Sequence, residues 1–69
     1  MKLSARNQLK GTIKSITPGA INSEVVIELA EGVEIASVIT NESVTNLELA
    51  VGKEAFAVLK ASNVMVGVA

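Results

Sequence analysis

Residues 24–39, which read EVVIELAEGVEIASVI, carry the clearest structural pattern in the chain. Apolar and polar positions alternate on both sides of Glu31-Gly32, and a period of two is typical of a β-strand with one buried face. A Gly in a polar pair is a turn signal. The stretch therefore predicts two half-buried strands joined by a turn. The alternating positions are Val25, Ile27 and Leu29 against Glu24 and Glu28, then Val33, Ile35, Ser37 and Ile39 against Glu34, Ala36 and Val38.

The sequence before this stretch predicts one more strand. Leu9, Gly11 and Ile13 alternate with polar residues, which indicates a first strand from Ser4 to Thr17. Pro18-Gly19 is the turn that ends it.

The sequence after this stretch predicts first a short helix and then two more strands. Alternation stops at residues 40–47, where Thr40 or Asn41 is a candidate N-cap and Val44 and Leu47 form the apolar side of one or two helical turns. Gly52 marks the next turn. Residues 54–60 and 62–68 are apolar on both faces, which predicts two last strands that are buried on both sides.

Five short strands with one short helical turn between the third and the fourth predict an all-β protein. The order is that of an OB-like five-stranded Greek-key barrel, here a single domain over residues 1–69. SH3-like barrels have similar strand numbers, so periodicity leaves that alternative open.

The composition predicts self-association. A domain of this size buries only about 60% of its unfolded surface, so it needs disulfides, metals or oligomerisation. The chain has no Cys and no His, yet it is 49% hydrophobic with a mean hydropathy of +0.49. We therefore expect a homo-oligomer.

Composition also argues against several functions. A net charge of −1 and a single aromatic residue, Phe56, do not suit nucleic-acid binding. Without His, Cys or Asp, the usual catalytic bases and thiols are missing, so we expect no enzyme. Apolar runs are too short to span a membrane, and residues 1–4 do not open a signal peptide. The expected location is the cytoplasm.

What remains is a set of hydrogen-bond donors suited to an oxyanion. Ser4 and Arg6 are two residues apart, as are Lys60 and Ser62, so each pair shares a face if it lies on a strand. Thr40 and Ser43 flank the start of the expected helix, where backbone N–H groups favour an anion. Each pair also has a simpler interpretation: a solvated terminus, an edge charge or a helix cap. Spacing does not show that the pairs converge.

A family resemblance joins these pairs. Ser4-Ala5-Arg6-Asn7-Gln8-Leu9-Lys10-Gly11 resembles the opening motif of molbindins, the small Mop-type molybdate-binding domains. The likeness continues through residues 19–25, through Ile39-Thr40 and Ser43, and through residues 60–64, so it covers essentially the whole chain.

The resemblance implies an OB-like barrel that exchanges strands with a partner and assembles as a hexamer, a trimer of dimers. Molybdate or tungstate would be held between subunits and stored in the cell, with no metal cation bound directly by side chains. One subunit would supply Ser4, the backbone of Ala5 and Arg6, and a neighbour would supply Thr40, Ser43, Lys60 and Ala61 or Ser62. A second kind of oxyanion site is expected at Gly19, Ala20, Ile21 and Asn22, although a plain hairpin turn is an equal interpretation. A non-catalytic protein-interaction module is the alternative function.

Overall fold

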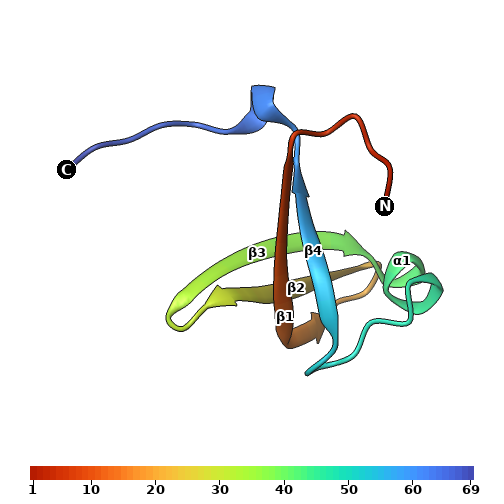
Figure 1. Ribbon diagram of the computed structural model, residues 1–69. Coiled ribbons are helices and arrows are strands. Elements are labelled where there is room, and N and C mark those ends of the chain that lie inside the picture. The colour runs from red at the N-terminus through yellow and green to blue at the C-terminus, as the bar shows by residue number, and fades with distance from the viewer.

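The computed structural model describes residues 1–69 and consists of one curled antiparallel sheet with a short helix at one end (Figure 1). The strands follow the order β3-β2-β1-β4 across the sheet. No helix has the length or the apolar character needed to cross a membrane. The elements are β1 (Asn7–Pro18), β2 (Asn22–Ala30), β3 (Val33–Thr40), α1 (Asn41–Asn46), β4 (Glu54–Leu59) and the 3-10 turn η1 (Ala61–Asn63).

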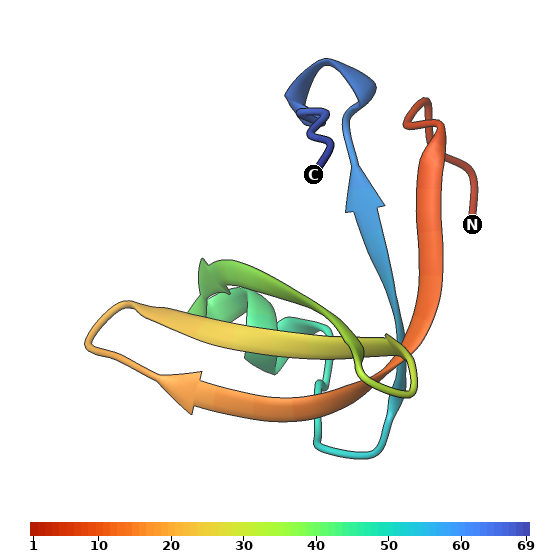
Figure 2. The same cartoon turned by 90° about the vertical axis from the view of Figure 1, so that its left-hand side faces the viewer.

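Strand β1 organises the sheet because it pairs with two strands in succession. Its first half, Asn7–Thr12, lies against β4, and its second half, Thr12–Pro18, lies against β2. The register with β2 shifts between Ile13 and Ser15, which marks a bulge. A bulge bends a strand and increases its twist. The two halves of the sheet therefore face different directions, and the sheet curls on itself (Figure 2).

The hairpin expected over residues 24–39 is confirmed. β2 and β3 pair antiparallel, and Glu28 lies opposite Glu34 next to the turn. Gly32 has a φ of 76°, a conformation that favours glycine. On the inner face Val25 and Ile27 are buried, as the alternation predicts.

The short helix is also confirmed, with Thr40 as its N-cap. The Thr40 hydroxyl oxygen accepts a hydrogen bond from the backbone N–H of Ser43 at 3.0 Å. After the helix ends at Asn46, the chain turns through Glu48, whose φ is 53°. The ammonium group of Lys53 donates to the Glu48 carbonyl oxygen at 2.8 Å, which satisfies a backbone acceptor beyond the helix end.

Two strand predictions do not hold within the single chain. The first strand begins at Asn7 rather than Ser4, and the fifth strand expected over residues 62–68 does not form; the sheet has four strands. After η1 the chain leaves the sheet (Figure 1). A strand needs a neighbouring strand edge for its backbone hydrogen bonds. The last residues meet no such edge within their own chain, so their apolar sequence alone does not make them a strand.

The core of the single chain is very small. Only five of the 69 residues are buried, and they are Ile13, Ser23, Val25, Ile27 and Ala57. Large apolar side chains such as Phe56, Val58 and Val38 remain exposed, although they lie on the strands themselves. The surplus of apolar residues that composition revealed is therefore left mostly on the surface of the chain.

Candidate functional site

The pairing of β1 with β4 brings two distant parts of the sequence together. Asn7 lies directly opposite Leu59 in this antiparallel pair. The residues that precede Asn7 and those that follow Leu59 must therefore emerge side by side at the same end of the sheet. Residues 4–6 and 60–62 meet there, although more than fifty positions separate them in the sequence.

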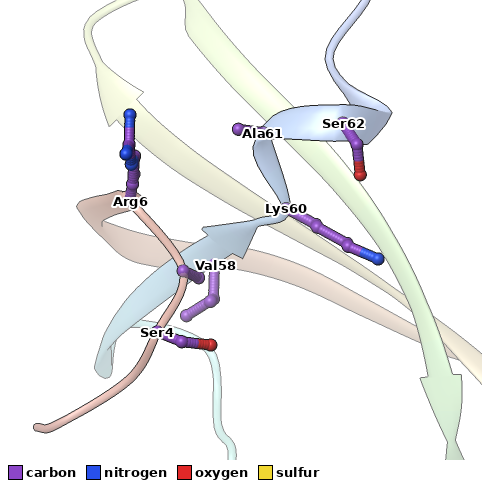
Figure 3. Close-up of a pocket in the computed structure, with 7 residues that line it drawn as sticks. Ser4, Arg6, Val58, Lys60, Ala61 and Ser62 are labelled. Atoms are coloured by element: carbon purple, nitrogen blue, oxygen red, sulfur yellow. The ribbon is translucent and has the colours of Figure 1, made fainter.

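An open pocket of about 540 Å³ lies between these two segments. It contains hydroxyl and cationic groups and no carboxylate, so its polar side chains suit a negatively charged ligand. Figure 3 shows the Arg6 and Lys60 side chains extending in different directions, so the two cations do not converge within one chain. The lining residues are Ser4, Ala5, Arg6, Val58, Lys60, Ala61 and Ser62.

The cationic side chains of this pocket form no ion pair or hydrogen bond within the chain. Lys10 forms an ion pair with Glu54 at 3.3 Å, and Lys14 reaches from β1 across β2 to pair with Glu34. That hydrogen bond and the Glu34 charge raise the pKa of Lys14. Arg6 and Lys60, in contrast, take part in no ion pair or side-chain hydrogen bond. Their charges are therefore available to a ligand.

A glutamine orders the backbone at the pocket wall. The Gln8 side-chain amide donates to the Ala5 carbonyl oxygen at 3.0 Å. This bond holds the carbonyl, an electron-rich group, against Gln8. Spacing alone could have suggested the contact, since Gln8 follows Ala5 by three residues.

The other predicted site residues lie elsewhere. Thr40 and Ser43 do not line the pocket, and their hydroxyl groups bond to each other at 2.9 Å. Thr40 lies opposite Asn22 in the β2–β3 pair. The structure therefore groups Thr40 and Ser43 with the Gly19–Asn22 turn rather than with Arg6 and Lys60 of the same chain.

Sequence reasoning missed three residues near these groups. Val58 lines the pocket two positions before Lys60, and strand alternation could have indicated this. Ser23 and Asn41 form a side-chain hydrogen bond next to the Gly19–Asn22 turn. Nothing in local sequence pattern links these two residues, because their contact depends on how β2 meets α1. The structure also contains no cluster of acidic side chains able to hold a metal ion.

The fold and the anion-suited pocket define a small all-β binding domain, and comparison with known proteins identifies the family. The TOBE domain model matches residues 3–66. The chain belongs to this family, among the Mop-type molybdenum-pterin-binding proteins. A probable molybdenum-pterin-binding protein of Haemophilus influenzae is 50% identical over 99% of both chains. Molybdenum-pterin-binding protein 1 of Clostridium pasteurianum is 46% identical over 96% of this chain and 97% of its own.

The domain also occurs within longer proteins. The molybdenum transport protein ModE of Azotobacter vinelandii is 52% identical over 94% of this chain, but the match spans only 24% of that protein.

Solved structures show the same fold. MopII from Clostridium pasteurianum superposes with a TM-score of 0.90 at 42% identity, covering 97% of this chain and 100% of that one. The cytoplasmic molybdate-binding protein ModG, solved with molybdate bound, gives a TM-score of 0.93 at 52% identity and covers all of this chain and 49% of its own. The resemblance to molbindins and the curled all-β fold are thereby confirmed.

Proposed function

We propose that this protein binds molybdate or tungstate in the cytoplasm and stores it without chemical turnover. The observation that carries the proposal is that Arg6 and Lys60 both line one pocket without carboxylates, and that neither has an ion-pair partner. Relatives described as molybdate-binding or molybdenum-pterin-binding support this choice of ligand.

The chemistry of the donors suits a fully deprotonated tetrahedral oxyanion. Arginine and lysine have only donors, and the Ser4 and Ser62 hydroxyl groups can each donate. Molybdate, tungstate and sulfate carry no proton near pH 7, whereas phosphate keeps one that needs an acceptor. Among the side chains of the pocket, only the Ser4 and Ser62 hydroxyl groups could accept this proton. An unpaired phosphate O–H costs about 1–3 kcal/mol, so we expect the pocket to disfavour phosphate where these hydroxyl groups donate. Rejection of sulfate then depends on the size of the completed site.

A subunit interface would complete the pocket. Within one chain the pocket is open, and Arg6 and Lys60 point to different sides (Figure 3). We infer that Ser4, Ala5 and Arg6 meet Thr40 and Ser43 of a neighbouring subunit. Lys60, Ala61 and Ser62, which were expected from the neighbour, lie beside Arg6 in the same chain instead. The position of Thr40 and Ser43 away from the pocket of their own chain supports a contribution from a neighbour.

Strand exchange is the assembly that would bury the exposed apolar surface. Beyond η1, Met65, Val66 and Val68 are more than nine-tenths exposed. A second, mainly apolar groove of about 350 Å³ lies on the sheet and includes Ile27 and Phe56. We propose that the C-terminal segment of a partner becomes the missing fifth strand, and that three such dimers form a hexamer.

We propose a second oxyanion site at the turn Gly19-Ala20-Ile21-Asn22. It lies beside Thr40, its residues are exposed, and it presents backbone N–H groups rather than charged side chains.

Titration calorimetry with molybdate, sulfate and phosphate tests the proposed function. We expect saturable binding of molybdate and markedly weaker binding of phosphate. Equal, weak binding of all three anions would contradict selective molybdate binding. Absence of heat with every anion would favour a domain that binds only protein partners.

A further inference from the structure

The carbonyl oxygens of the Gly19–Asn22 turn are nearly all engaged within the protein. The Asn22 carbonyl accepts from the Gly19 backbone N–H at 2.7 Å, and the Ile21 carbonyl accepts from the Asn41 backbone N–H at 2.7 Å. The Gly19 carbonyl accepts from the Asn41 side-chain amide at 2.9 Å. Three acceptors of one exposed turn are therefore directed toward protein donors.

Asn41 alone supplies two of these three donors. Its side chain is held in one orientation by Ser23, whose hydroxyl donates to the Asn41 side-chain oxygen. Ser23 is only 3% exposed, so it has little access to water as an alternative partner. Because the oxygen faces Ser23, the amide nitrogen must face the Gly19 carbonyl.

The N–H groups of the same turn remain free. The backbone N–H groups of Ala20 and Ile21 donate to no acceptor in the protein, and both residues are exposed. The turn therefore leaves two N–H donors free, whereas three of its four carbonyl oxygens, all but that of Ala20, are bonded within the protein. Gly19 keeps it tight, because an added Cβ would lie 2.9 Å from the Asn22 carbonyl oxygen.

We propose that Asn41 is a positioning residue for the second oxyanion site. It does not contact the anion; it holds the Gly19 and Ile21 carbonyl oxygens away, so that the Ala20 and Ile21 N–H groups can meet the ligand. A carbonyl oxygen turned toward an oxyanion would repel it, whereas an N–H group forms a charge-assisted hydrogen bond with it. This inference rests on the proposed binding of molybdate.

The test follows backbone amide resonances during a molybdate titration. In the unaltered protein, the Ala20 and Ile21 amide signals should shift as molybdate is added. Asn41→Ser retains the backbone N–H but removes the side-chain amide. It should weaken the response at Ala20 and Ile21 at least tenfold while the signals of Ser4 to Arg6 respond as before.

Two further variants separate positioning from a loss of stability. Thr45→Ala is the matched control, since the Thr45 hydroxyl bonds to the Asn41 carbonyl oxygen at 3.2 Å and does not contact the turn. It should leave both responses unchanged. Ser23→Ala frees the Asn41 amide to rotate, and we expect a smaller loss confined to Ala20 and Ile21. This variant provides the answer if Asn41→Ser does not fold.

The outcomes are distinguishable. If Ala20 and Ile21 never respond while Ser4 to Arg6 do, the second site and this inference are wrong, but molybdate binding stands. Full response at Ala20 and Ile21 in both the Asn41 and Ser23 variants would also overturn the inference. If no signal anywhere responds to molybdate, the proposed function itself fails.

Discussion

The basic side chains of this protein divide by what the fold does with them. Lys10 and Lys14 pair with glutamates across the sheet, and Lys53 binds carbonyl oxygens after α1. Arg6 and Lys60 have no such partner, and both line the pocket at the end of β1 and β4. The sequence shows equivalent isolated charges at all these positions. Only the contacts distinguish a charge that supports the fold from one that is available to a ligand.

Replacing a free cation should therefore weaken anion binding. We expect Arg6→Ala and Lys60→Ala each to raise the Kd for molybdate at least tenfold, about 1.4 kcal/mol, because each removes a charged donor. Titration calorimetry at constant ionic strength measures the effect. Lys10→Ala is the control, since it removes the same charge from β1 outside the pocket. If all three variants bind alike, the pocket is not the site.

At the scale of elements, β1 determines where the pocket forms. Its first half pairs with β4 and places residues 4–6 beside residues 60–62, and its second half pairs with β2. The close approach of these strands depends on Gly11. A Cβ at this position would lie 2.5 Å from the Glu28 carbonyl oxygen and 2.7 Å from Cγ2 of Ile27. Both neighbours belong to β2, so neither can move without disturbing the sheet.

Gly11→Ala should destabilise the fold for this reason. Overpacking of a well-packed site typically costs about 1–3 kcal/mol, and we expect a loss of unfolding free energy in that range. Urea unfolding at a fixed protein concentration measures it. Thr12→Ala, at an exposed neighbouring position, should change stability by less than about 0.5 kcal/mol. Equal stability of the Gly11 variant would show that the strands can separate without cost.

At the scale of the whole molecule, the single chain buries too few residues to form a substantial core. Five buried residues form a very small core, while apolar side chains on β4 and beyond η1 stay exposed. Association that removes such surface from water contributes roughly 25 cal/mol per Å². The proposed exchange of C-terminal segments would bury both the segment and the groove that includes Phe56.

Removal of residues 64–69 should therefore break the assembly. We expect the full chain to have the mass of a hexamer in light scattering, and the shortened chain to be smaller and less stable. Removal of Ala69 alone is the control and should leave the mass unchanged. A shortened chain that retains the full assembly would show that the C-terminal segment is not exchanged.

Local patterns predicted much of the fold. Alternation around Glu31-Gly32 correctly indicated the β2–β3 hairpin, and Thr40 as a candidate N-cap correctly indicated the start of α1. Both features depend on residues that are close in sequence. The fifth strand was predicted on the same grounds and does not form within the single chain, because a strand also needs a free edge beside it. No local pattern reports whether that edge belongs to the same chain.

For the donors of the candidate site, too, local sequence and long-range contacts determine different properties. Their chemistry and the absence of His and Cys are properties of the sequence, and so is the alternation that makes the protein all-β. Whether donors from distant positions share one pocket depends on register: Asn7 opposite Leu59 joins Arg6 to Lys60, and Asn22 opposite Thr40 separates Thr40 and Ser43 from them. Register arises from long-range strand pairing and from a bulge in β1, and neither is encoded in the spacing of the donors themselves.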